Sequence, residues 1–272
     1  MTMIIEREVP MAQSNQTVNR IERIEFFGSV IDPLTMNETL QRVEEIIRTR
    51  AITQHVVINV AKLVLMQKDD KLRAAVNACG LINADGQGVV WGANLLGRKI
   101  PERVAGIDLF KNIVELSSKK GLRLYFLGAQ ENVVSKVIRI LKSQYPQLQV
   151  AGFRNGYFSK EEEGQVAEDI RDSCADVLFV AMGSPQKEFF LNKYCETMAV
   201  TFVMGVGGSF DVIAGVTGRA PLWMQKAGLE WFFRFLCEPG RMWKRYLITN
   251  TIFGGMVLKA LIKKESHSCE KK

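Results

Sequence analysis

The residue best placed for acid–base chemistry is Asp85, which ends a short apolar run, LINA, that predicts a β-strand. Gly86 and Gly88 follow it and leave its carboxylate uncrowded. A hydroxyl group is a poor nucleophile, and a positioned carboxylate can take its proton as it attacks. The alternative is that Asp85 only starts a turn or caps the next helix, as aspartate often does.

Other polar and glycine residues occur where an apolar run gives way to a helical pattern. In open parallel sheets, ligands bind beyond the carboxyl ends of the strands. Glycine-bearing turns at such ends can hold phosphate through backbone N–H groups, although they also simply allow a helix to pack closely on a strand. Together they favour a nucleotide-type ligand. The residues expected to bind it are Asn59, Asn83, Gln87, Gly128, Gly183, Ser184, Lys187, Glu188, Gly207 and Asp211.

Dinucleotide, ATP and metal chemistry are disfavoured. The segment GVGGSF carries Phe210 where a dinucleotide fingerprint needs its third glycine, and GxxxxGK[ST] is absent. The five cysteines are dispersed without a CxxC, which is typical of a reducing cytosol, and there are only two histidines. The sequence therefore predicts no metal site and no bound cofactor.

Positive charge is concentrated at the C-terminal end of the chain. From residue 215 onward there are eleven Lys or Arg against four Asp or Glu, which accounts for the whole net charge of +7. This imbalance suggests an anionic partner, namely a membrane surface, a phosphate or nucleic acid, although a solvated basic tail is the plain alternative. No nucleic-acid-binding motif occurs. The arginines that could neutralise a diphosphate are Arg103, Arg219, Arg234, Arg241 and Arg245.

The same C-terminal region interleaves its arginines with aromatic residues such as Trp223, Trp231 and Trp243. This mixture at helical spacing is typical of a helix lying in a membrane interface. It also fits a helix docked on a core, or a contact between copies of the chain, so self-association stays open. The most apolar stretch, residues 246–262, contains polar residues and Lys259 and is a poor candidate to span a membrane.

The elements that must position these residues alternate along the chain. A strand or short hairpin is predicted at residues 24–32, and apolar strands are predicted at residues 55–60, 81–85, 122–128, 148–153, 176–183 and 200–208. Helices are predicted at residues 35–50, 62–78, from 89, 108–120, 131–144, 160–173 and 185–198. This rhythm predicts an α/β fold with a mostly parallel, Rossmann-like sheet and helices on both faces. We expect a loose segment at 1–23, a core at 24–217 and a basic helical appendage at 218–272.

Four segments resemble the WecG/TagA/CpsF glycosyltransferases (glycosyltransferase family 26). They are NADGQGVVWGANLLGRKIPERVAGIDL, AMGSPQKE, GVGGSFDVIAG and RAPLWMQKAGLEWFFRFLCEPGRMWKRY, and the likeness extends over residues 24–253. It implies inverting transfer of a sugar, N-acetylmannosamine or a related hexose, from a UDP-sugar to a sugar on undecaprenyl diphosphate. No metal would be required. It also implies a peripheral protein on the cytoplasmic membrane face, in cell-surface polysaccharide or teichoic acid synthesis.

The resemblance places the family's proposed base at Asp85 and its basic positions at the C-terminal arginines. Two residues depart from the family pattern: Val57 stands where threonine is common, and Lys187 stands at a usual glutamine position. Both departures suggest a donor or acceptor that differs from the family's usual one. The rival functions are a nucleotide-sugar or NAD-dependent oxidoreductase, and a non-catalytic membrane scaffold of a polysaccharide assembly complex.

Overall fold

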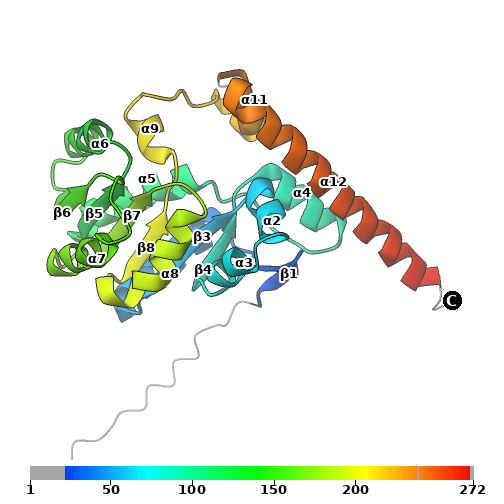
Figure 1. Cartoon of the computed structure of the whole chain (residues 1–272), viewed down its shortest axis with the longest axis horizontal. Coiled ribbons are helices and arrows are strands. Elements are labelled where there is room, and N and C mark those ends of the chain that lie inside the picture. The colour runs from blue at the N-terminus through cyan, green and yellow to red at the C-terminus, as the bar shows by residue number, and fades with distance from the viewer. Residues whose placement is uncertain (1–21, 238, 270–272) are drawn as a thin grey trace, which may run out of the picture.

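Six parallel strands form the central sheet of the computed structural model, which describes residues 22–237 and 239–269 (Figure 1). Within these ranges the side chains of residues 241, 242, 244, 245 and 264–269 lie outside the description. The strand order is β4-β3-β8-β7-β5-β6, and every pairing is parallel. The strands are β3 (Thr53–Ile58), β4 (Leu81–Ala84), β5 (Arg123–Gly128), β6 (Gln149–Arg154), β7 (Val177–Ala181) and β8 (Phe202–Gly205).

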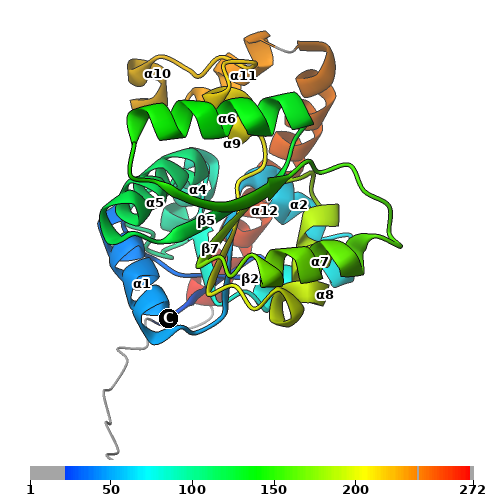
Figure 2. The same cartoon turned by 90° about the vertical axis from the view of Figure 1, so that its left-hand side faces the viewer.

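Helices cover both faces of this sheet, which explains why its central strands are apolar throughout rather than alternating (Figure 2). One face carries α1 (Met36–Thr49), α5 (Gly106–Lys120), α6 (Glu131–Gln144) and α9 (Ser209–Ile213). The other carries α2 (Val60–Met66), α3 (Asp70–Asn77), α4 (Gln87–Leu95), α7 (Glu163–Asp172) and α8 (Gln186–Met198). The predicted α/β class is confirmed.

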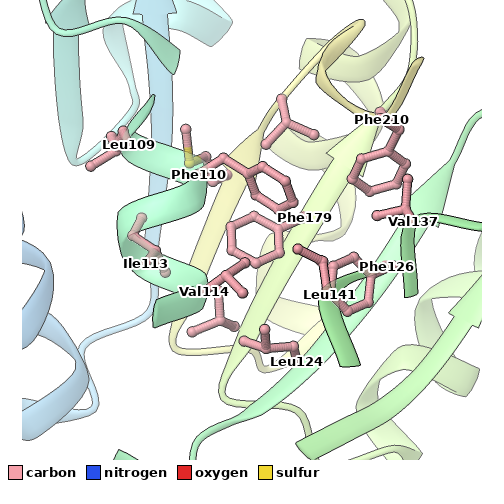
Figure 3. Close-up of a cluster of buried hydrophobic side chains, with 14 of the residues drawn as sticks. Leu109, Phe110, Ile113, Val114, Leu124, Phe126, Val137, Leu141, Phe179 and Phe210 are labelled. Carbon is pink, nitrogen blue, oxygen red and sulfur yellow. The ribbon is translucent and has the colours of Figure 1, made fainter. Parts of the chain in front are cut away.

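The first of these faces packs around a group of buried aromatic rings (Figure 3). Phe110 of α5 meets Phe179 of β7 edge-on, with ring centroids 4.5 Å apart. Phe126 and Phe210 lie against the same group. Phe210, which breaks the dinucleotide fingerprint, is fully buried, so its position in the sequence is explained by packing.

The predicted helix over residues 62–78 is wrong in one respect, because the chain forms two helices there. α2 ends at Met66 and α3 begins at Asp70. Asp69 caps α3 by accepting a hydrogen bond from the backbone N–H of Leu72 at 2.9 Å. The helix predicted from residue 35 is confirmed, and a capping box of Thr35 and Glu38 starts it.

Outside the sheet, β1 (Ile24–Phe26) and β2 (Ser29–Ile31) form an antiparallel hairpin. The described part of the C-terminal region consists of helices joined by short turns: α10 (Leu222–Lys226), α11 (Glu230–Cys237) and the long α12 (Pro239–Cys269). The boundary expected at 217/218 falls between α9 and α10. The expected loose segment at 1–23 lies, up to residue 21, outside the described residues.

Helix α12 crosses the core on the side of α2 and α4 (Figure 1). Phe253 and Val257 of α12 belong to the same buried cluster as Val89 and Ala93 of α4. Gly92 permits this approach, since a Cβ there would lie 2.8 Å from the Phe253 ring. Among the described residues, no helix is both long enough and apolar enough to cross a membrane.

Candidate active site

At one point along the predicted ligand-binding edge, the helices that follow neighbouring strands change from one face of the sheet to the other. Strands β3 and β8 are neighbours, yet α2, which follows β3, and α9, which follows β8, lie on opposite faces of the sheet. Such a point leaves a crevice at the carboxyl ends of the strands, where open α/β sheets bind ligands. Asp85 follows β4, the strand beside β3.

Two backbone contacts fix Asp85 at this edge. Its N–H donates to the carbonyl of Ile58 at 2.7 Å, which continues the pairing of β4 with β3. Its carboxylate Oδ2 accepts a hydrogen bond from the N–H of Gly106, the first residue of α5, at 3.2 Å. Residues 105–106 thus aim the positive end of a helix dipole at the carboxylate.

The surroundings of Asp85 tune it as a proton acceptor. Burial raises the pKa of its carboxyl above the ordinary 3.8, while Arg103 and the Gly106 N–H act in the opposite direction. Glu230 adds to the rise and Arg234 opposes it. A carboxylate whose pKa is raised is a stronger base than an exposed aspartate.

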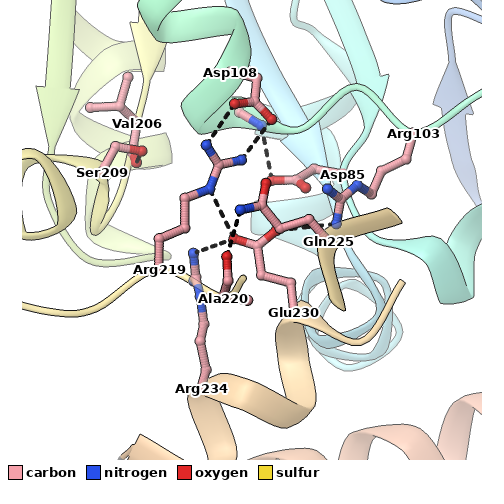
Figure 4. A network of polar contacts seen from close by, with 11 residues as sticks. Asp85, Arg103, Asp108, Val206, Ser209, Arg219, Ala220, Gln225, Glu230 and Arg234 are labelled. Atoms are coloured by element: carbon pink, nitrogen blue, oxygen red, sulfur yellow. Dashed lines mark hydrogen bonds and ion pairs between the residues drawn. The ribbon is translucent and has the colours of Figure 1, made fainter. Parts of the chain in front are cut away.

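A cluster of arginines meets Glu230 next to Asp85 (Figure 4). Arg103 approaches the Glu230 carboxylate at 3.2 Å, and Arg219 and Arg234 each approach it at 3.7 Å. The Glu230 side chain is only 11% exposed, so these charges interact with little screening by water. Three guanidinium groups around one carboxylate form a site suited to a compact anion.

Arg219 also ties this cluster to the core. Its two terminal nitrogens each lie 2.7 Å from the Asp108 carboxylate, one on each oxygen, in a bidentate pair. Asp108 lies in the first turn of α5, the helix that holds Asp85 through Gly106. These contacts fix the segment before α10 beside Asp85.

A second, deeper group of charges lies where α2 and α8 begin. The Glu188 carboxylate is 2.8 Å from the Lys62 ammonium and 3.3 Å from that of Lys187, and all three side chains are buried. The stem of Lys187 lies across Gly205 at the end of β8, where a Cβ would come 2.5 Å from Lys187 Cε. Burial by itself raises the pKa of Glu188, but Lys62 and Lys187 outweigh it and lower that pKa to about 2.

We expect Glu188→Gln to lower the free energy of unfolding at pH 7 by about 3 kcal/mol. A carboxyl whose pKa is 4.5 when unfolded and about 2 when folded adds this stability above pH 4.5 and loses it as the pH falls towards 2. Urea denaturation across that range measures the effect. Glu163→Gln is the control, because its surface pair with Lys193 contributes at most about 1 kcal/mol. Equal losses of stability in both variants would contradict the stabilisation of the ionised Glu188 carboxylate by Lys62 and Lys187.

One predicted site residue, Asn83, lies in the core. It has no exposed surface, and its side-chain amide bonds His55 at 3.0 Å and Thr39 at 3.1 Å. These contacts stabilise the core, and a role of Asn83 in ligand binding stays a prediction. Burial also lowers the pKa of His55 to about 4, so this histidine is neutral and structural.

The remaining predicted residues lie along the strand-end edge or in the appendage. The Asn59 side chain caps α2 through the Lys62 N–H. Gly128 has φ +124° and meets the Ala181 backbone so closely that a Cβ would lie 2.3 Å from its carbonyl oxygen. Around Gly183 and Gly207 the space is open. Gln87 is the first residue of α4, and Asp211 lies in α9. Ser184 precedes α8, and Lys187 lies in its first turn.

Arg241 and Arg245 lie in α12, but their side chains are outside the described part of the chain. Sequence reasoning missed Glu230, Asp108 and Lys62. For Glu230 there was a signal, since it is an acidic residue at the head of a basic, aromatic helix. Among the described residues, no three His, Cys, Asp or Glu side chains come together in a group that could hold a metal ion.

Comparison with known proteins gives a consistent result. A family model described as the glycosyl transferase WecG/TagA/CpsF family matches residues 24–267. Two curated relatives, from Bacillus spizizenii and Bacillus subtilis, are 36% identical to this chain over 180 residues, which is 66% of this chain and 69% of each relative. Each is named N-acetylglucosaminyldiphosphoundecaprenol N-acetyl-beta-D-mannosaminyltransferase.

Proposed function

The chain belongs to the WecG/TagA/CpsF family of glycosyltransferases, and on this basis we propose that it transfers a sugar from a UDP-sugar to a sugar carried on undecaprenyl diphosphate. The donor is N-acetylmannosamine-type or a related hexose. The support is the pair of curated relatives, whose names specify an N-acetylmannosaminyl transfer to a lipid-diphosphate-linked N-acetylglucosamine.

Asp85 acts as the general base in this proposal. Its carboxylate takes the proton from the acceptor hydroxyl, whose oxygen then attacks the anomeric carbon and forms the new glycosidic bond. The bond to the UDP oxygen breaks on the opposite side, so the configuration at that carbon inverts. The observation that carries this assignment is the raised pKa of a carboxylate held by α5 at the ligand-binding edge.

The arginines stabilise the negative charge that develops on the leaving UDP. Arg103, Arg219 and Arg234 already converge on one carboxylate, Glu230, so the same guanidinium groups can surround a diphosphate. With this compensation we expect transfer to need no metal ion. Lys187, at a position where the family usually has glutamine, is buried beside Glu188 and is proposed to alter the shape of the sugar pocket.

We also propose that the appendage rests on the cytoplasmic face of the membrane, where a lipid-linked acceptor is found. Exposed side chains of α10 and α11, namely Leu222, Trp223, Trp231 and Leu236, lie among the basic residues of the region. Family membership does not favour the oxidoreductase or scaffold alternatives.

The test is UDP release from a panel of UDP-sugars, with a synthetic lipid-diphosphate N-acetylglucosamine as acceptor and with or without EDTA. We expect one donor to release UDP only when acceptor is present, at a rate that EDTA leaves unchanged. Loss of activity in EDTA that Mg²⁺ restores would overturn the metal-free proposal. No acceptor-dependent release with any donor would overturn the proposed reaction.

A further inference from the structure

Helices α4 and α12 lie side by side (Figure 1), and the side chains of both line an apolar groove. Its volume is about 330 Å³, and its walls consist of aliphatic side chains, aromatic side chains and glycines. Trp91 and Leu95 line it from α4, and Leu258 lines it from α12, and all three remain exposed to solvent. Gly254, on the same wall, has open space where its side chain would be.

The groove begins close to the candidate active site. Gly88, at its α4 end, is in the first turn of the helix that follows Asp85. Gln87, in the same turn, packs against Gly228, just before Glu230 of the arginine cluster. An acceptor whose hydroxyl lies at Asp85 would therefore have its diphosphate and its first isoprene units near the mouth of the groove.

An acceptor of the proposed kind has this composition. A sugar and a diphosphate form its polar end, and a polyisoprenyl chain continues from the second phosphate. The basic appendage complements the anionic part, while the groove, whose walls are mostly apolar, suits a hydrocarbon. Its volume lies at the lower end of the roughly 300–1,000 Å³ of small-molecule pockets, so it would hold only the isoprene units nearest the diphosphate.

We propose that the groove between α4 and α12 binds the proximal polyisoprenyl chain of the lipid-linked acceptor. This inference rests on the proposed function and adds to it a second recognition site, which selects acceptors by their lipid. Helix α4 connects the groove to Asp85. Helix α12 forms the second apolar wall, and Phe253 and Val257 hold it against the core.

The test compares two acceptors that share the N-acetylglucosaminyl diphosphate but carry either an undecaprenyl chain or a short, water-soluble alkyl chain. Both are assayed in detergent micelles with wild-type protein and with Leu95→Asn and Leu258→Asn. We expect the wild type to have a kcat/KM about tenfold or more higher for the long chain. Each variant should lose most of that preference through a higher KM, because an apolar contact the size of a leucine has been removed.

Leu247→Asn is the matched control. Leu247 lies on α12 and is 62% exposed, against 59% for Leu258, but it does not line the groove. It should keep the wild-type preference. An equal loss of preference in Leu247→Asn would assign the preference to general contact of α12 with lipid and would overturn the groove site. A wild-type protein without any preference for the long chain would also overturn it.

A direct binding measurement separates this inference from the proposed reaction. A polyprenyl phosphate that carries a photoreactive diazirine in its first isoprene units is cross-linked to the full chain, and the labelled peptides are identified. Label on residues 88–95 and 253–261 supports the groove even if no sugar transfer is found. Label elsewhere, together with transfer to the short acceptor, would leave the reaction intact and refute the groove.

Discussion

Asp85→Asn is expected to lower kcat/KM for sugar transfer by about 10²- to 10⁴-fold, the usual loss when a general base is removed. Asparagine keeps the size of the side chain and an oxygen that can accept the hydrogen bond from Gly106 N–H. It cannot take a proton from the acceptor hydroxyl. The loss should appear in kcat, since the binding contacts of both substrates are retained.

The stability of this variant gives an internal check. The pKa of Asp85 is raised in the folded protein, so stability falls as the pH rises from 3.8, the ordinary pKa, to the folded pKa, and this cost persists at higher pH. A neutral asparagine removes that cost, and the melting temperature at pH 7 should be no lower than that of the wild type. Asp69→Asn is the control, because asparagine caps a helix as well as aspartate does. Activity of Asp85→Asn within a few fold of that control would refute the base assignment.

Arg103→Gln is expected to lower kcat/KM by about 10²-fold, the loss typical of one charged group that stabilises a transition state. It should also change the pH dependence. Arg103 lowers the pKa of Asp85 against the effect of burial, so its removal raises that pKa further. Because the base must be ionised, the acidic limb of the kcat/KM profile should move to higher pH.

The shift of the acidic limb separates catalysis from a loss of structure. A variant that merely loosens the contact between α11 and the core would lose activity at all pH values alike. Arg98→Gln is the matched control, since Arg98 is exposed and lies five residues earlier. An unmoved limb, or a limb at lower pH, would show that Arg103 does not act on Asp85 as described.

Much of the fold could be predicted because it depends on local patterns. Apolar runs such as residues 122–128 and 176–183 coincide with β5 and β7, and the capping box at Thr35 marks the start of α1. The split between α2 and α3 was missed because residues 67–71, which lie between Met66 and Leu72, include no glycine or proline to mark a break. The cap at Asp69, which starts α3, is a single side chain within a helical pattern.

The site could be predicted only where it follows the strand ends. Asp85 was found in this way, because the chain direction alone places it at the ligand-binding edge. Glu230 and Asp108 were missed because each pairs with an arginine more than a hundred residues away in the sequence, Arg103 and Arg219 respectively. The strand at Asn83 was predicted, but the sequence does not show that its side chain points into the core towards His55.

The groove along α4 and α12 could not be predicted at all. Each helix presents apolar residues that are equally consistent with burial in a core. Only the contact of Gly92 with Phe253 sets the distance between them, and that distance decides whether Trp91 and Leu258 meet or leave a gap. Long-range packing of this kind leaves no periodic signal in either segment.

The most direct test of sugar transfer with inversion is to isolate the lipid product that the wild-type protein forms from the donor that releases UDP. Its mass and its anomeric configuration are then determined by mass spectrometry and NMR. We expect the acceptor to have gained one sugar, with the configuration at the anomeric carbon opposite to that of the donor. A product with retained configuration would contradict direct attack by a hydroxyl deprotonated at Asp85, and free sugar without any modified lipid would contradict transfer to the acceptor.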